Sequence, residues 1–159
     1  MLEIKEYVNN RKQVIKDIIA AKEKQKKLAI IQIGDNQASN SYVKGKLKDC
    51  EEVGIPTVLC KRDKSISQDE LDRVVSNLNN DESIGGIIVQ LPLPKHLTVN
   101  LELIDDDKDV DGFKITSNFV PCTPLGIITY LESQNIEFDG KNAVVIGRSD
   151  IVGKPMAKL

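Results

Sequence analysis

Three short apolar runs, separated by segments with helical periodicity, constrain this sequence more than any other feature. The runs lie at 28–33, 57–60 and 85–90, and a glycine directly follows the first of them. A nearly continuous apolar run of this length is typical of a strand buried on both faces in a parallel sheet. Helical patterns occupy 39–53 and the segment from Ser67 onward. The alternation predicts an α/β fold, a three-layer αβα domain with a mainly parallel sheet and right-handed crossovers.

The last part of the chain predicts the beginning of a second domain. Thr123 and Pro124 are expected as the N-cap and the first residue of a helix. A further strand is predicted over 141–147, and a glycine-containing turn then leads into a helix start. A strand, a tight turn and a helix N-terminus form the phosphate-binding device of dinucleotide-binding domains. The spacing departs from G-x-G-x-x-G because Ser149 stands in place of the second glycine, although Arg148 and Ser149 could serve a ribose phosphate.

The chain length sets the expected domain organisation. A chain of 159 residues suffices for one domain with a real core, or for one domain and part of another. We expect residues 1–120 to form the first domain, beginning with an amphipathic helix over about 3–25. We expect residues 121–159 to form a linker helix and the first strand and helix start of an incomplete Rossmann-like domain.

Charge and composition exclude several classes of function. The net charge of −2 creates no global field that favours nucleic acid or an anionic membrane. No apolar run approaches the roughly 20 residues of a membrane helix. The cysteines, Cys50, Cys60 and Cys122, have no metal-ligand spacing and cannot all pair, and the single His96 argues against a Ser-His-Asp triad or a histidine-rich metal site. We expect a cytoplasmic protein with reduced thiols, no metal, and no nucleic-acid or membrane partner.

The helix predicted over 39–53 carries the first candidate catalytic side chain. Ser39 is its expected N-cap, and Gly54 is expected to end it. The apolar stripe comprises Val43, Leu47 and Cys50. At about 100° per residue, Lys46 lies at the edge of that stripe, and Tyr42 lies one turn before it. A half-shielded amine beside a phenol suits proton transfer, whereas the helix alone favours the simpler interpretation of a lysine that snorkels over a tyrosine.

Two further candidates belong to segments expected at the edge where ligands bind in parallel sheets, the end of a predicted strand and the acidic loop after Ile104. Gln90 ends an apolar run, so its amide can point into a cleft or can merely satisfy backbone groups of the proline turn that follows. Asp111 precedes a glycine and an aromatic residue. A single buried carboxylate there could accept hydrogen bonds from the N–H groups of a ligand.

The acidic segment around Asp111 also has a partial metal-binding pattern. Asp107, Asp109 and Asp111, followed by Gly112, match the first half of a calcium loop, D-x-D-x-D-G. The match fails later, because Asn118 occupies the position of the bidentate glutamate. A solvated acidic loop is the simpler interpretation, and a calcium-binding loop is kept only as a third, minor hypothesis.

Six motifs in the same order and with similar gaps resemble one family, the bifunctional methylenetetrahydrofolate dehydrogenase/methenyltetrahydrofolate cyclohydrolases. The matching segments are 34–39, 41–46, 86–94, 108–113, 121–127 and 145–155. This sequence departs from the family pattern directly after 108–113. The family has His-Pro there and, after one further residue, Asn and Gly, whereas this sequence has a loop that begins with Lys114 and contains Asn118. The resemblance runs from about residue 28 to residue 159, so it implies the fold and the domains of that family for nearly the whole chain.

The resemblance implies a role for each candidate residue. Lys46 corresponds to the catalytic amine, with Gln90 positioning it and Tyr42 beside it. The folate site implied by the resemblance comprises Tyr42, Gln90, Leu91, Pro92 and Asp111, with Asp111 holding the pterin. Residues Gly147, Arg148 and Ser149 resemble the family's contact with NADP.

The implied activity is oxidation of methylenetetrahydrofolate with NADP and hydrolysis of the methenyl form to formyltetrahydrofolate, in a homodimer that takes tetrahydrofolate derivatives as partners. Members of the family run to nearly twice this length, and the second half supplies most of the cofactor domain. If this is the complete polypeptide, we expect hydride transfer to be absent or nearly so. The alternative, from a different class, is a non-catalytic folate-binding or dimerising fragment.

Overall fold

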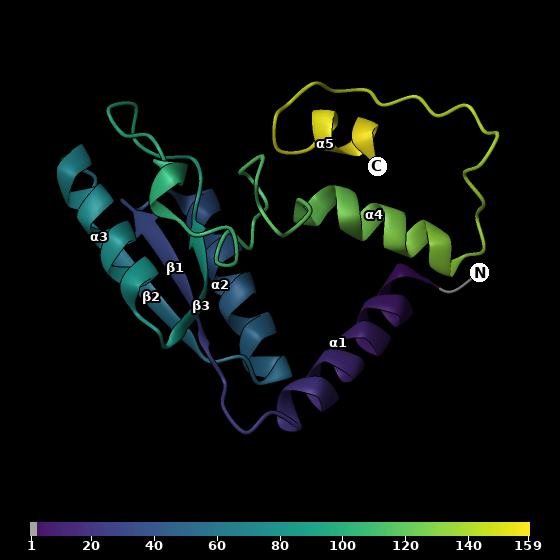
Figure 1. The fold of residues 1–159 in the computed structure, drawn as a ribbon, viewed down its shortest axis with the longest axis horizontal. Helices are drawn as coiled ribbons and strands as arrows, with labels where there is room; N and C mark the ends of the chain where they lie inside the picture. Colours follow the sequence, from purple (N-terminus) through teal and green to yellow (C-terminus); the bar gives the residue numbers. More distant parts are fainter. Residues whose placement is uncertain (1–2) are drawn as a thin grey trace.

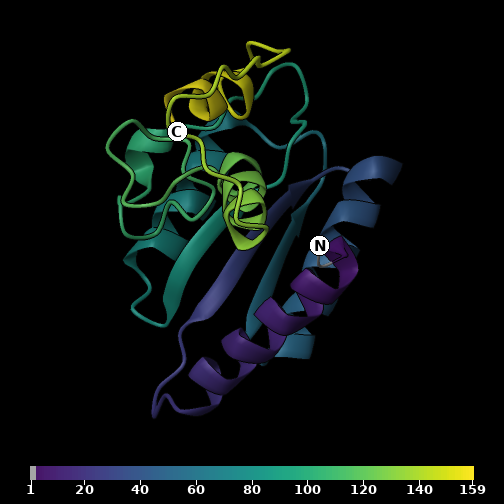
Figure 2. The same cartoon turned by 90° about the vertical axis from the view of Figure 1, so that its right-hand side faces the viewer.

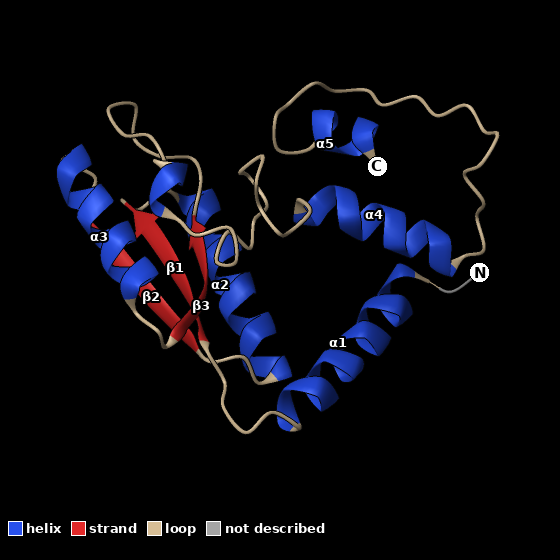
Figure 3. Cartoon of the chain, viewed as in Figure 1, coloured by secondary structure: helices blue, strands red, loops and turns tan. Residues whose placement is uncertain are grey.

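The computed structural model describes residues 3–159 and contains a parallel sheet with helices on both faces (Figures 1 and 3). The elements are α1 (Ile4–Ala20), β1 (Lys27–Ile33), α2 (Gln37–Val53), β2 (Thr57–Arg62), α3 (Gln68–Asn80), β3 (Ile84–Val89), η1 (Leu101–Leu103), α4 (Cys122–Ser133) and α5 (Gly153–Lys158). The strand order is β2-β1-β3, and both pairs are parallel. The predicted α/β class and parallel sheet are confirmed.

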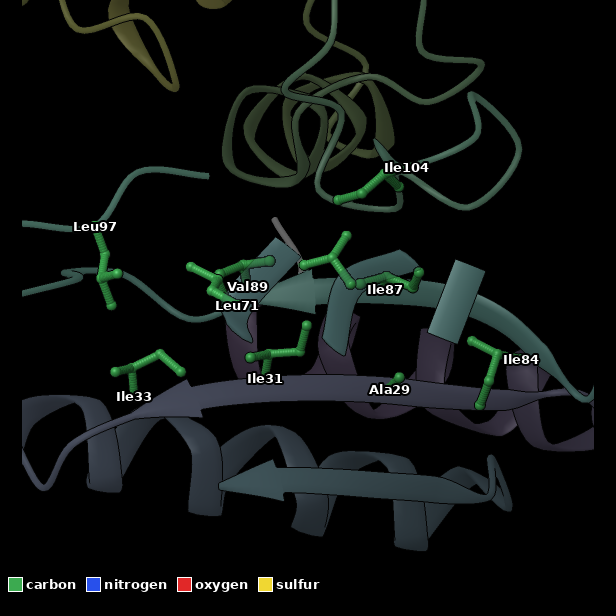
Figure 4. Close-up of a cluster of buried hydrophobic side chains, with 10 residues drawn as sticks. Ala29, Ile31, Ile33, Leu71, Ile84, Ile87, Val89, Leu97 and Ile104 are labelled. Atoms are coloured by element: carbon green, nitrogen blue, oxygen red, sulfur yellow. The ribbon is translucent and has the colours of Figure 1, made fainter. Parts of the chain in front are cut away.

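The middle strand, β1, divides the core into two layers. Alternate residues of a strand face opposite sides of the sheet, so Ile31 packs toward α3 while Ile30 packs toward Val43 of α2. Figure 4 shows the larger layer, in which side chains of β1 and β3 meet Leu71 of α3. Helices therefore cover both faces of the sheet, as the three-layer prediction requires.

Most of helix α1 lies away from the sheet (Figures 1 and 2). It is shorter than the predicted 3–25 and buries none of its residues. Lys12 ties it to α2 through ion pairs with Asp49 and Glu52. At the other end, the ring of Tyr7 packs edge-on against that of Tyr130 in α4, with centroids 5.3 Å apart.

The ends of two helices differ from the sequence prediction. Helix α2 starts earlier than expected, because the side chain of Asn36 accepts a hydrogen bond from the backbone N–H of Ser39 at 3.1 Å. Asn36 is therefore the N-cap in place of Ser39, and Gly54 ends the helix in the left-handed conformation, as predicted. Helix α4 follows Pro121 without a side-chain cap, so the prediction of Thr123 as N-cap is wrong.

Residues 141–147 form no strand in the structure, contrary to the prediction. A strand needs a neighbouring strand to satisfy its backbone N–H and C=O groups, and no segment of residues 3–159 pairs with this one. Val144 and Ile146 are 86% and 98% exposed as a result. The helix start predicted after this segment is present as α5. Within the described part of the chain, no helix has the length and hydrophobicity needed to cross a membrane.

Candidate functional site

Helix α2 presents Tyr42 and Lys46 one turn apart, with Tyr42 exposed and Lys46 at the edge of the buried stripe. Val43 is 3% exposed and anchors the helix to the sheet, whereas the ring of Tyr42 is 67% exposed. Lys46 is half-buried, while Lys44 and Lys48 are exposed. The position of Lys46 at the edge of the apolar stripe, predicted from periodicity, is therefore observed.

Lys46 and Asp111 lie close enough for their charges to interact, although their segments are far apart in sequence. Burial raises the pKa of the Asp111 carboxyl, the ammonium of Lys46 opposes that rise, and the carboxylate of Asp109 adds to it. The same lysine and Asp111 act on the thiol of Cys122, whose pKa is raised mainly by burial. The structure thus brings Lys46, Asp111 and Cys122 together into one cluster.

A tight turn presents Asp111 in this cluster. The N–H of Gly112 donates to the carbonyl of Asp109 at 3.0 Å, which places Val110 and Asp111 at the centre of the turn. Gly112 has a φ of +68°, and a Cβ there would lie 2.7 Å from the carbonyl oxygen of Phe119. Glycine has no Cβ and adopts a positive φ without strain, so it is the residue that fits at the end of this turn.

The two carboxylates of the Asp-Val-Asp motif have different roles. Asp109 is 2% exposed, and its Oδ2 accepts a hydrogen bond from the backbone N–H of Lys114 at 2.8 Å. Its carbonyl also accepts from the hydroxyl of Ser117 at 3.0 Å. Asp109 therefore holds the loop together, whereas Asp111 makes no hydrogen bond within residues 3–159 and keeps its oxygens available for a ligand.

Gln90 lies beyond the end of β3 with one half of its amide satisfied. Its Nε2 donates to the carbonyl of Leu91 at 2.7 Å, whereas its Oε1 is buried and has no partner among the described residues. A buried acceptor without a donor is uncommon and suits a ligand or a mobile ammonium group. The amide nitrogen therefore satisfies the proline turn, as one interpretation expected, whereas the other, that the amide points into a cleft, stays a prediction.

The other two predicted folate residues, Leu91 and Pro92, form a cis peptide at the same strand end. The hydroxyl of Ser39, buried on α2, donates to the carbonyl of Leu91 at 3.4 Å and so joins α2 to the proline turn. Pro92 lines a cavity of about 690 Å³ on the side of Gly34 and His96. A separate cavity of about 640 Å³ lies against Cys122, next to the turn of Asp111.

The acidic loop uses its carboxylates internally. Lys114 makes an ion pair with Asp106 at 2.6 Å, the hydroxyl of Thr116 donates to the same carboxylate at 2.8 Å, and the amide of Asn118 donates to Asp107. No group of three potential metal ligands occurs within residues 3–159. Residues 114–118, which depart from the family pattern, therefore bind the carboxylates of the acidic loop. The calcium hypothesis gains no support from these contacts.

The glycine-containing turn before α5 is compact. A Cβ on Gly153 would lie 2.6 Å from the carbonyl carbon of Gly147, so the two glycines allow the backbone to fold back on itself. The Oγ of Ser149 accepts a hydrogen bond from the N–H of Gly153 at 3.2 Å. Arg148 is exposed beside this turn. Gly112 and Pro155 of α5 line one cavity, so this end of the chain lies next to the residue that follows Asp111.

These features define an α/β domain with a candidate site formed by α2 and the loops after the parallel strands, followed by a glycine-containing turn before α5. Residues 2–111 match the sequence profile of the tetrahydrofolate dehydrogenase/cyclohydrolase catalytic domain, and residues 121–159 match that of the NAD(P)-binding domain of the same enzymes. The chain belongs to the tetrahydrofolate dehydrogenase/cyclohydrolase family.

Individual relatives agree with this assignment. The bifunctional protein FolD of Campylobacter jejuni is 44% identical over 98% of this chain and 58% of its own length. The FolD protein of Listeria innocua is 48% identical over 83% of this chain and 50% of its own length. The chain therefore spans little more than half the length of these relatives.

Solved structures show the same fold. The crystal structure of the C. jejuni bifunctional enzyme superposes with a TM-score of 0.87 at 43% identity, covering 92% of this chain and 57% of that one. The Trypanosoma brucei enzyme, solved with NADP and an inhibitor, gives a TM-score of 0.86 at 29% identity, covering 92% of this chain and 55% of that one.

Sequence reasoning missed three residues that the structure places in or around the site. Ser39 was assigned only to helix capping, and Asp109 could not be distinguished from Asp111 by pattern. Cys122 was treated only as a reduced thiol. The Sγ of Cys122 donates to the carbonyl of Val110 at 3.5 Å. The available sequence signal was its position directly after a proline, at the start of the helix that follows the acidic loop.

Proposed function

We propose that this chain carries the folate site of an enzyme of one-carbon metabolism, which oxidises methylenetetrahydrofolate with NADP and hydrolyses methenyltetrahydrofolate to formyltetrahydrofolate. The observation that carries the proposal is the half-buried carboxyl of Asp111, which has no hydrogen-bond partner within residues 3–159 and whose pKa is acted on by the nearby charge of Lys46. We propose the domain division at 1–120 and 121–159, with the folate site in the first part. The ranges of the two family matches support this division.

Folate recognition requires an acceptor for the N–H groups of the aminopyrimidine ring. Asp111 has no hydrogen-bond partner of its own within residues 3–159, so both oxygens can accept in the bidentate geometry that a carboxylate favours. The exposed ring of Tyr42 offers an aromatic surface for the rings of the folate. The ammonium of Lys46 lies beside Asp111, so an entering pterin would also be close to this amine.

Lys46 is proposed as the proton-transfer group of the hydrolysis. Water adds its oxygen to the amidinium carbon of the methenyl group, and the free amine of Lys46 accepts a proton from that water. The proton held by Lys46 then passes to N5 as the carbon–N5 bond breaks, and the hydroxyl of the adduct loses its proton to become the C=O of the formyl group on N10, so one proton is released overall. The free Oε1 of Gln90 is proposed to accept a hydrogen bond from the amine and so to orient it.

We propose that Gly147, Arg148 and Ser149 contact NADP, which would accept a hydride when bound. The close approach of Gly153 to Gly147 supports a turn that can fit against a phosphate. Arg148 would bind a phosphate by charge and Ser149 a hydroxyl or phosphate oxygen.

A non-catalytic folate-binding or dimerising fragment is the second candidate. It is favoured by the segment 141–147, which pairs with no strand within residues 3–159. It predicts folate binding without hydrolysis or NADPH formation by this chain alone.

We also propose a homodimer in the cytoplasm. Strand β2 is an edge strand, and Leu59 on it is 41% exposed, so a second copy could pair along this edge. All three cysteines are free thiols, which is the state expected in a reducing compartment. Light scattering should give twice the mass of the chain, and a Leu59→Lys variant should then give the mass of one chain.

Hydrolysis of methenyltetrahydrofolate, followed by its absorbance, tests the catalytic proposal. The wild-type chain should accelerate hydrolysis, and Lys46→Met should abolish the acceleration. Lys48→Met is the matched control on the exposed side of the same helix and should retain activity. Equal activity of the Lys46→Met and wild-type proteins would refute the role of Lys46, and inactive but folate-binding wild-type protein would favour the fragment hypothesis.

A further inference from the structure

The turn that presents Asp111 is attached to α3 by one lysine. The ammonium of Lys108 donates to the carbonyl of Asn79 and, at 3.0 Å, to the carbonyl of Asp81. These carbonyls belong to the C-terminal end of α3, where a helix leaves acceptors without intrahelical partners and where its dipole favours a cation. Lys108 is half-buried, so the two hydrogen bonds are partly shielded from water.

The main chain of Lys108 is fixed to the sheet as well. Its carbonyl accepts from the N–H of Ile87 in β3 at 2.9 Å and from that of Val110, also at 2.9 Å. Its own N–H donates to the carbonyl of Asp105 at 2.8 Å. The residue is therefore held at its backbone by β3 and at its side chain by α3.

The next contact carries this restraint toward Asp111. Val110 packs against Gly86 so closely that a Cβ on Gly86 would lie 2.6 Å from Cγ1 of Val110. Val110 is therefore closely packed against β3, and Asp111 follows it directly in the turn. Lys108 is linked to this turn through its backbone, because its carbonyl accepts from the N–H of Val110.

We propose that Lys108 is a positioning residue for folate recognition: by binding the C-terminal carbonyls of α3, it fixes the turn that carries the Asp111 carboxylate. The inference rests on the proposed folate site. Lys108 itself does not touch the ligand, because its ammonium is occupied by α3.

The test is titration calorimetry with 5-formyltetrahydrofolate, a stable reduced folate, on variants of the full chain. Lys108→Met should weaken binding about 10-fold or more, since small displacements of a positioned group have effects of this size. Lys108→Arg, which can donate to both carbonyls, should bind within about threefold of wild type, and Lys108→Gln should fall between them. Lys16→Met, an exposed lysine of α1, is the matched control and should bind like wild type.

A double-mutant cycle with Asp111→Asn separates positioning from general loss of structure. If Lys108 acts through Asp111, Lys108→Met should change affinity less than about twofold in the Asp111→Asn background, because the group it positions has lost its charge. The same 10-fold loss in both backgrounds, or unchanged binding by Lys108→Met, would overturn the inference. Absence of binding by the wild-type chain is a different result and would refute the proposed folate site itself.

Discussion

The ammonium of Lys46 partly offsets the effect of burial on the carboxyl of Asp111, across two segments that the fold brings together. Burial favours the neutral carboxyl, whereas the neighbouring cation favours the carboxylate. The net direction is a raised pKa of Asp111, so this group is costly to keep ionised in the free protein. Groups held in an unfavourable state of this kind are characteristic of binding and catalytic sites.

The first prediction concerns stability and pH. Because the folded state raises the pKa of Asp111 above its ordinary value of 3.8, the folded protein binds this proton more tightly than the unfolded chain does. Stability from this group is therefore lost as the pH rises through the raised pKa. Asp111→Asn should increase the free energy of unfolding at pH 7, measured by urea unfolding, and the increase should vanish below about pH 3.8.

The control for this prediction is Asp139→Asn, which removes a charge from an exposed position. It should leave the free energy of unfolding within about 0.5 kcal/mol of wild type at both pH values. A loss of stability in Asp111→Asn at pH 7 would show that the carboxylate is satisfied by a partner in the free protein.

The second prediction concerns the end of the turn that presents Asp111. Gly112→Ala should destabilise the protein by about 2 kcal/mol or more, because alanine is strained at positive φ and its Cβ would meet the backbone of 119–121. Gly126→Ala is the matched control. It lies inside α4 with nothing within 4 Å of the added carbon, so it should stabilise by about 0.5–1 kcal/mol. Thermal unfolding of both variants measures the difference, and equal shifts in the two would contradict this account.

The third prediction concerns the start of α3. The hydroxyl of Ser67 accepts from the N–H of Glu70 at 3.2 Å, and the carboxylate of Glu70 accepts from the N–H of Ser67 at 2.8 Å, a complete capping box. Ser67→Ala should cost about 1 kcal/mol in urea unfolding. Ser76→Ala, in the interior of the same helix, should be neutral or slightly stabilising. A cost in Ser76→Ala as large as that in Ser67→Ala would remove the capping explanation.

The sheet and the capping box could be predicted from sequence because each is encoded locally. Apolar runs and a Ser-x-x-Glu pattern suffice when tertiary contacts support the same structure. The N-cap of α2 was placed wrongly because Asn36 and Ser39 are both good capping residues and the pattern does not rank them. The buried environment of Ser39 against Leu91 decides between them, and it is a tertiary contact.

The site was only partly predictable for the same reason. Helical spacing identified Tyr42 and Lys46, and the residues before Gly112 suggested a ligand carboxylate. The roles of these residues remain predictions. The distinct role of Asp109 depends on the donors in 114–118, which no local pattern connects to it. Residues 141–147 show the converse, since a strand pattern forms no strand where no partner strand lies beside it.

The most direct measurement of the central claim is the affinity of 5-formyltetrahydrofolate for the wild-type chain and for Asp111→Asn, determined by titration calorimetry at pH 7. The account predicts measurable binding by the wild-type protein and a loss of about 10-fold or more in Asp111→Asn, because a charge-assisted bidentate acceptor is replaced by a neutral amide. Asp139→Asn should bind like wild type. Equal affinity of the wild-type and Asp111→Asn proteins would contradict the assignment of Asp111 as the folate carboxylate.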